Sequence, residues 1–282
     1  MRKNQGLFQT LFLLIILPFM ALGVVCLNGS AALAERSYAN LANNGELRCG
    51  YALSPPYLVK DPQSGALSGY DYDIWTEIGK ELDLKIIWSE QVGLGNVVEG
   101  LKSNKFDVFC SQIWLDSGRI RALTLTDPIL FTKVKLYARK DDVRFDGDLK
   151  KINDSTVSMA AIENDVTNFM VTRGFPDAKV DLQPPFATRS DMAASLLGQK
   201  SDVLILDQAS AEAIDALDPG KMREIANIPP LYNLPAYYAV ARGQYQLRDM
   251  INIALHNIIN DGRLANIVRS HSASFILPRK DF

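Results

Sequence analysis

Arg119 and Asp207 are the two residues of this 282-residue chain whose sequence context points most clearly to chemistry. A planar guanidinium can donate two parallel hydrogen bonds to a carboxylate, so Arg119 is a candidate anion-binding group. Asp207 directly follows the apolar run 203–206, and a carboxylate at the end of a buried strand needs a partner. Two simpler interpretations stay open: a solvated Arg119 beside Arg121, and an Asp207 that only caps the helix from Ala209.

The sequence lacks the usual motifs of metal, nucleotide and hydrolytic sites. No Cys-x-x-Cys, His-Glu-x-x-His or Gly-x-Ser-x-Gly string occurs. His256 and His271 are the only histidines, and we expect them to be surface or packing residues. Gly93, Gly95 and Gly100 follow a predicted strand, but the third glycine comes two positions too late for a dinucleotide-binding turn. We therefore expect neither a metal nor a cofactor.

The first 34 residues have the three parts of a secretory signal peptide. Arg2 and Lys3 precede an uncharged run over 11–27, and the small-x-small exit 32–34 follows. We predict cleavage after Ala34 and export to the periplasm.

Two other fates of this segment stay open, namely an uncleaved membrane anchor and a lipoprotein attached through Cys26. Pro18 interrupts the apolar run, which falls short of the roughly 20 residues of a spanning helix. The residues before Cys26 are poor for lipoprotein processing, so cleavage is the preferred prediction.

The mature chain of 282 − 34 = 248 residues is mildly acidic. Loss of Arg2 and Lys3 moves the formal charge from −2 to −4, and no basic run remains. Nucleic-acid binding therefore has no electrostatic basis here. The hydrophobic content of 48% can fill a core, and the length suits one large domain or two small ones.

Strands and helices alternate in two cycles, which predicts parallel sheets with helices on both faces. Two strands that run into charged or Gly-containing sequence, 134–141 and 235–243, are the expected crossings between the cycles. A helix over 247–259 ends at Asp261-Gly262. The first cycle comprises strands 47–52, 84–88 and 106–111 with helices 71–82 and 96–102; the second comprises strands 158–162, 180–182 and 203–206 with helices 166–172, 191–197 and 209–217.

The string 69–82 predicts a turn followed by a capped helix. Gly69 permits the turn, Asp71 is placed to cap the first helical turn, and Asp73 puts negative charge at the positive end of the helix. One face of the helix is apolar at every fourth residue, which predicts a buried stripe. The residues of this stripe are Ile74, Ile78 and Leu82.

The string 69–82 resembles the signature of the bacterial extracellular solute-binding proteins, family 3, the periplasmic polar amino-acid-binding components of ABC transporters. The resemblance continues in the spacing of seven residues from Arg119 to Thr126 and in the closing pattern 247–264, and it spans about 47–267. It implies a two-lobed α/β fold, the type II periplasmic binding protein fold. Each lobe is then a mainly parallel sheet flanked by helices, with two hinge crossings. The implied division is 1–34 for the signal, 35–138 plus 239–282 for lobe 1, and 139–238 for lobe 2.

The same resemblance implies roles for the two charged residues. Arg119 would hold the α-carboxylate of an amino-acid ligand, and Asp207 would hold its α-ammonium group. Ligands of open α/β sheets lie beyond the carboxyl ends of the strands, so the ends near 54, 112, 162 and 207 should face the cleft. Four positions where this chain departs from the family indicate a reshaped pocket: Gln112 and Trp114 replace Ser or Thr, and Ser54 and Leu94 replace aromatic residues. Tyr57 is a further ligand-binding candidate.

The turn Asn164-Asp165-Val166 is the remaining candidate site. It resembles the family's glycine-containing turn at a helix N-terminus, and Asn164 can adopt the left-handed conformation that glycine usually supplies. The exposed N–H groups of the turn could hold a carboxylate. However, Asp165 would cap the helix itself, and its charge would disfavour a further anion nearby.

Cys49 and Cys110 are the cysteines that remain after cleavage. They stand on strands expected to be neighbours, and the periplasm permits a disulfide. Two buried, inert thiols are the simpler alternative.

The resemblance implies a monomeric binding protein, not an enzyme, that delivers a small-molecule ligand to an inner-membrane ABC permease. One alternative is a periplasmic enzyme on the same fold, similar to the cyclohexadienyl dehydratases. Its acid or base would be Glu163 or Asp165. Another alternative is a free-standing sensory protein.

Overall fold

The computed structural model describes residue 41, residues 44–271 and residues 275–278. The predicted signal peptide and its cleavage site lie outside these residues. All the elements named below belong to the unit Gly45–Phe282. Among the described residues, every helix is too short or too polar to cross a membrane.

The first lobe is built on a sheet in which three parallel strands meet an antiparallel one. β1 (Glu46–Tyr51) pairs in parallel with β4 (Lys85–Gln91) and with β5 (Val108–Ile113). β12 (Tyr232–Ala241) runs antiparallel to β5 and to the short β6 (Leu123–Leu125). The predicted strands 47–52, 84–88 and 106–111 are therefore present, with ends shifted by one to three residues.

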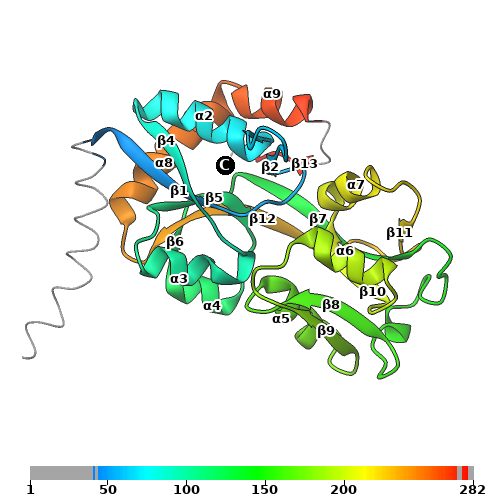
Figure 1. Ribbon diagram of the computed structural model, residues 1–282. Helices are drawn as coiled ribbons and strands as arrows, with labels where there is room; N and C mark the ends of the chain where they lie inside the picture. The colour runs from blue at the N-terminus through cyan, green and yellow to red at the C-terminus, as the bar shows by residue number, and fades with distance from the viewer. Residues whose placement is uncertain (1–40, 42–43, 272–274, 279–282) are drawn as a thin grey trace, which may run out of the picture. The chain divides into compact units, whose positions relative to one another are not determined.

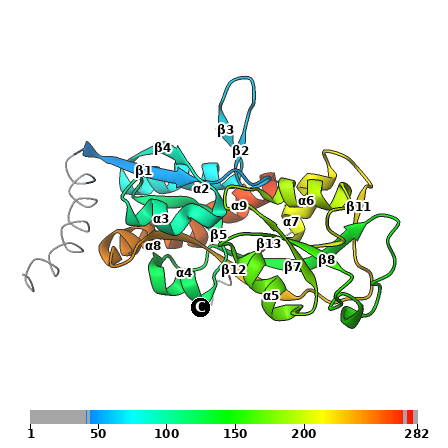
Figure 2. The same cartoon turned by 60° about the horizontal axis from the view of Figure 1, so that its bottom comes forward.

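Helices cover both faces of this sheet (Figure 1). The helix α2 (Tyr70–Leu82) buries Ile74 and Ile78 as predicted and leaves Leu82 partly exposed. A short hairpin of β2 (Val59–Lys60) and β3 (Leu67–Ser68) stands out beyond the sheet, as Figure 2 shows. The helices on one face are α2 (Tyr70–Leu82), α8 (Tyr245–Asn260) and α9 (Arg263–Ser270), and those on the other face are η1 (Leu94–Asn96), α3 (Val97–Lys102) and α4 (Ser117–Ala122).

The prediction that Asp71 caps α2 was wrong. The helix begins at Tyr70, its N-cap residue is Gly69, and no side chain caps it. Asp71 turns inward and accepts hydrogen bonds from the hydroxyl of Tyr238 (2.9 Å) and the N–H of Gln112 (3.1 Å). Because the helix starts one residue earlier than expected, this carboxylate faces β5 and β12 instead of the first-turn N–H groups.

The second lobe repeats the arrangement of the first. β8 (Ser158–Ile162) pairs in parallel with β9 (Lys179–Gln183) and with β10 (Val203–Asp207), and β7 (Leu130–Arg139) runs antiparallel to β10. The other elements of this lobe are η2 (Leu149–Lys151), α5 (Val166–Gly174), α6 (Arg189–Leu197), α7 (Gln208–Asp215) and β11 (Met222–Glu224), which pairs with β7.

The strand β10 shows why its sequence is continuously apolar. Val203 and Ile205 belong to the hydrophobic cluster under α5, whereas Leu204 and Leu206 belong to the cluster under α6 and α7. Successive side chains of a strand point to opposite faces, so a strand covered on both sides needs an apolar residue at every position. The prediction of a strand buried on both faces is confirmed.

Two long strands join the lobes. Residues 232–236 of β12 pair antiparallel with β7, and the following residues of β12 pair with β5 and β6 of the first lobe. The change of partner in β12 lies within the expected range 235–243, whereas residues 134–138 of β7 already pair with β10 of the second lobe, and both strands begin earlier than expected. A strand that was not predicted, β13 (Phe275–Ile276), pairs with β7 at Phe131 and Thr132.

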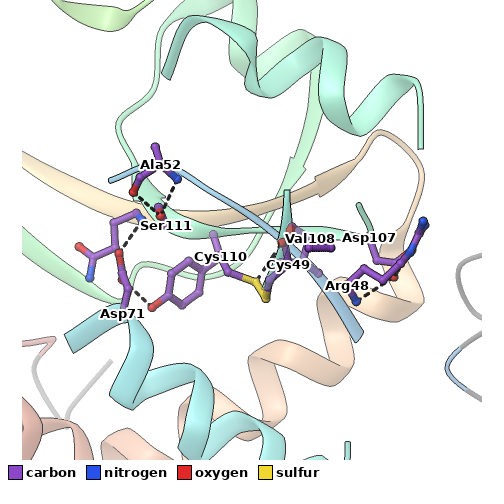
Figure 3. The surroundings of a disulfide bond; sticks show 11 residues. Arg48, Cys49, Ala52, Asp71, Asp107, Val108, Cys110 and Ser111 are labelled. Atoms are coloured by element: carbon purple, nitrogen blue, oxygen red, sulfur yellow. Dashed lines mark hydrogen bonds and ion pairs between the residues drawn. A yellow bond between two sulfur atoms is a disulfide. The ribbon is translucent and has the colours of Figure 1, made fainter. Parts of the chain in front are cut away.

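A disulfide links Cys49 of β1 to Cys110 of the adjacent parallel strand β5 (Figure 3). The Cα atoms of the two cysteines are 5.4 Å apart, and both residues are fully buried. The sequence left open a disulfide or two buried thiols, and the structure contains the disulfide.

Candidate functional site

A small cavity lies where the carboxyl ends of strands from both lobes meet. Its volume is about 30 Å³, which leaves room for about two water molecules. Eight of the ten predicted site residues line it. They are Ser54, Tyr57, Leu94, Gln112, Trp114 and Arg119 from the first lobe and Asp165 and Asp207 from the second.

Two predicted site residues, Asn164 and Val166, are not among the lining residues. Asn164 adopts the left-handed conformation expected of it, with φ 59°. Val166 is buried in the hydrophobic cluster under α5. The turn therefore has the predicted backbone form, but it contributes its charged middle residue, Asp165, to the cavity. Residues that line the cavity without having been predicted are Ala52, Ser111, Ile113 and Arg189.

Arg119 lines the cavity and is only 3% exposed, which rules out a solvated arginine. Its Nη1 donates to the carbonyl oxygen of Trp114 (3.0 Å), and its Nη2 donates to that of Leu94 (2.6 Å). Nη2 also donates to Oδ2 of Asp165 at 3.0 Å. The guanidinium thus joins its own lobe to the second lobe through a buried ion pair.

Asp165 accepts hydrogen bonds at both carboxylate oxygens. As the N-cap of α5, its Oδ1 accepts from the N–H (3.1 Å) and the hydroxyl (2.7 Å) of Thr167. The same oxygen accepts from Nη1 of Arg189 at 2.8 Å. Burial by itself would raise the pKa of Asp165, but the charges of Arg189 and Arg119 outweigh it and hold this pKa well below its ordinary value. The group is therefore a fixed carboxylate.

The sequence analysis missed Arg189, the second cation of the cavity. It is the first residue of α6, is buried, and places its guanidinium 5.1 Å from the centre of the Trp114 ring. A cation at the positive N-terminal end of a helix is unfavourable unless an anion stands close by. That position was the signal in the sequence that could have identified Arg189.

Asp207 also lines the cavity. Its Oδ1 accepts from the Tyr57 hydroxyl (2.7 Å) and from the N–H of Ser210 (2.8 Å). It therefore caps α7, as one interpretation held, and it also faces the cavity. Burial, followed by the charge of Asp207, raises the pKa of Tyr57 far above its ordinary value, so Tyr57 is a neutral hydrogen-bond donor.

Two glycines let the lobes approach closely beside this cavity. The N–H of Gly95 donates to the carbonyl oxygen of Pro185 in the second lobe at 3.1 Å. A Cβ atom on Gly95 would overlap the carbonyl oxygen of Glu163, and one on Gly93 would overlap that of Pro185. The loop with Gly93 and Gly95, which does not match a dinucleotide-binding turn, is therefore a contact surface between the lobes.

We expect Gly95→Ala to hold the lobes apart and to weaken ligand binding roughly tenfold or more, since overpacking costs about 1–3 kcal/mol. Small-angle X-ray scattering would show a larger radius of gyration in the variant, and calorimetry would give the affinity. Gly174→Ala is the matched control, because a Cβ atom there meets nothing within 4 Å. Identical scattering from both variants would contradict the expectation.

Asp71, in the first turn of α2, is a second unusual carboxyl group and is fully buried (Figure 3). Burial raises the pKa of Asp71 to about 7, against the opposing hydrogen bonds from Tyr238 and Gln112. The unfolded chain releases this proton near pH 4, whereas the folded protein keeps it until about pH 7. Stability must therefore fall as the pH rises through this window, because only the unfolded state gives up the proton.

The contribution of Asp71 to the free energy of unfolding should fall by about 1.4 kcal/mol between pH 5 and pH 6. Asp71→Asn removes the ionisable group and keeps the shape of the side chain. Urea unfolding gives the free energy of unfolding of the wild type and of the variant at both pH values. The change with pH in the wild type, minus the change in the variant, is the contribution of Asp71. If the two proteins respond equally to pH, Asp71 is not a buried neutral acid.

The described residues contain no cluster of three or more histidine, cysteine, aspartate or glutamate side chains able to hold a metal ion. Among the charged groups of the cavity, Asp165 is instead paired with Arg119 of the other lobe and with Arg189 of its own lobe. The fold and this cavity define a protein of the two-lobed, ligand-enclosing class.

The family model of bacterial extracellular solute-binding proteins, family 3, matches residues 47–273. The chain belongs to this family, which has a solute-binding role. This chain is 23% identical over 237 residues to the L-cystine-binding protein TcyA of Bacillus subtilis. The aligned region covers 82% of each of the two chains.

Solved structures share the fold. AbpA from Streptococcus pneumoniae, bound to L-arginine, superimposes with a TM-score of 0.72 at 15% identity, covering 83% of this chain and 97% of that one. The ancestral amino acid-binding protein AncCDT-1, a precursor of cyclohexadienyl dehydratase, has a TM-score of 0.70 at 19% identity, covering 82% and 97%.

Proposed function

We propose that this protein binds an amino acid or a related small amine in the cavity between its lobes and delivers it to an ABC permease of the inner membrane. The observation that carries the proposal is the pair of contacts across the cavity, Arg119 with Asp165 and Tyr57 with Asp207. Each joins one lobe to the other, so the lobes must part for a ligand to enter a space of about 30 Å³.

The moving bodies in this proposal are residues 35–138 with 239–282 and residues 139–238. The first boundary lies at the end of β7 and the second lies inside β12. Export through a signal peptide cleaved after Ala34 and action as a monomer complete the proposal. Similarity to the amino-acid-binding relatives supports the choice of an amine-bearing ligand.

Within this cavity Asp207 would hold the ammonium group of the ligand, with Tyr57 orienting the carboxylate. Ser54, Leu94, Gln112 and Trp114 would form the walls. Arg119 and Arg189 would form the cationic part of the cavity, with Asp165 bound to both. Asn164 and Val166 would support the turn that presents Asp165.

The permanent ionisation of Asp165 favours ligand binding without catalysis over an enzymatic role. A general acid or base must exchange protons near neutral pH. Asp165 is held as a carboxylate by two arginines, and its pKa lies far below that range. The dehydratase alternative would therefore depend on Glu163, which does not line the cavity.

A thermal-shift screen of residues 35–282 against amino acids, amines and organic acids tests the proposal, with Asp207→Asn as the decisive variant. Asparagine can still cap α7 and accept from Tyr57, but it lacks the charge. A stabilising solute should bind the variant at least tenfold more weakly, because hydrogen bonds to charged groups contribute about 1.5–3 kcal/mol. The proposal fails if no solute stabilises the wild type or if Asp207→Asn binds equally well.

A further inference from the structure

We infer that Asp165 is a built-in carboxylate that occupies the cationic end of the cavity, so that the ligand is an amine without a free carboxylate beside its ammonium group. This inference rests on the proposed function and narrows its ligand class.

The first argument is that Arg119 is already engaged. Nη2 of Arg119 donates to Leu94 and Asp165, and Nη1 donates to Trp114. A guanidinium has five N–H groups, and a bidentate carboxylate needs two that point in parallel. The two outward N–H groups of Nη2 are both used, so Arg119 presents no such fork to a ligand. Arg189 directs Nη1 to the same carboxylate.

The second argument is that Asp165 cannot swing away easily. Its Oδ1 caps α5 through two hydrogen bonds from Thr167, and its side chain is only 1% exposed. Loss of an N-cap costs about 1 kcal/mol, and an unpaired buried carboxylate costs considerably more. A ligand carboxylate placed at Arg119 would therefore lie beside the fixed negative charge of Asp165. Two carboxylates that share one site repel each other, so this arrangement is unfavourable.

The third argument is the balance of charge among the residues that line the cavity. Arg119 and Arg189 supply two positive charges, and Asp165 and Asp207 supply two negative charges. Asp165 is bound to both cations, whereas the contacts of Asp207 are with the neutral donors Tyr57 and Ser210. Among these lining residues, the carboxylate that lacks a cation is Asp207. A cationic ligand would pair with Asp207. An anionic ligand would find both cations of the cavity already paired with Asp165.

Matched pairs of probes that differ only in the carboxylate test the inference on the wild-type protein. The pairs are agmatine with arginine, cadaverine with lysine, and histamine with histidine, and argininamide serves as a probe that keeps the arginine skeleton. Calorimetry should give at least tenfold tighter binding for the member that lacks the carboxylate. If an amino acid binds as tightly as its decarboxylated partner, the inference is wrong and the proposed function stands. If no probe binds, both are wrong.

Asp165→Ser provides a second, independent test. Serine keeps an N-cap for α5 but frees both arginines. We expect the preference to reverse, with the amino acid gaining at least tenfold in affinity relative to its partner. Asp154→Ser is the matched control, because Asp154 also accepts from the N–H and the hydroxyl of the residue two positions later, yet it is exposed. A folded Asp165→Ser protein with an unchanged preference would overturn the inference, and the wild-type comparison decides the matter if this variant does not fold.

Discussion

Arg119→Ala should lower the free energy of unfolding by about 3–5 kcal/mol, the usual cost of removing one partner of a buried ion pair. Asp165 would keep Arg189 but lose the cation that approaches its Oδ2. The carbonyl oxygens of Trp114 and Leu94 would also lose their donor in the cavity. Because Arg119 is bonded to both lobes, the variant should be less closed as well as less stable.

Arg121→Ala is the matched control for this experiment. It removes an exposed arginine from the same short helix, α4, and should change stability by less than about 0.5 kcal/mol. Urea unfolding gives the free energies, and small-angle scattering reports how far the lobes are closed. A cost for Arg119→Ala similar to that of the control would show that the ion pair contributes little.

The pH dependence of the same pair has a defined sign. The pKa of Asp165 is lowered in the folded state, so its contribution to stability is fully present above the pKa of the unfolded chain, near 4, and is lost as the pH falls below it. Arg119→Ala should therefore lose less stability than the wild type when the pH is lowered from 4 to 3.

Removal of the disulfide is the second change with a large expected effect. The bridge closes a loop with a sequence separation of 61 residues, for which the chain-entropy relation gives about 4 kcal/mol of stabilisation. The double variant Cys49→Ala, Cys110→Ala should lower the urea midpoint accordingly. Both alanines leave cavities in a fully buried region, which adds to the loss.

A reductant separates these two contributions. Dithiothreitol in the urea solution should lower the midpoint of the wild type and leave that of the double variant unchanged. Because the bond is buried between β1 and β5, reduction should follow unfolding and not precede it. Equal midpoints for oxidised and reduced wild-type protein would show that the bridge does not contribute to stability.

The sequence was sufficient for the order of elements and for most of the cavity. Strand β10 could be predicted because a strand covered on both faces needs apolar residues throughout, and Asp207 follows from its position at the end of that strand. The pattern around Arg119 favoured an arginine of the cleft over a solvated one, and Arg119 is buried and lines the cavity. The Asn164-Asp165 turn was also predictable, since the left-handed residue and the helix cap are local features.

Contacts between residues distant in sequence were decided only by the tertiary structure. Asp165 could be recognised as a helix cap, but its two arginines come from positions 46 residues before it and 24 residues after it. Similarly, Asp71 has the spacing of a cap, but it bonds to Tyr238, 167 residues away. Local patterns follow from backbone geometry and burial, which the sequence itself encodes. The partner of a buried charge depends on which strand ends the two sheets bring together.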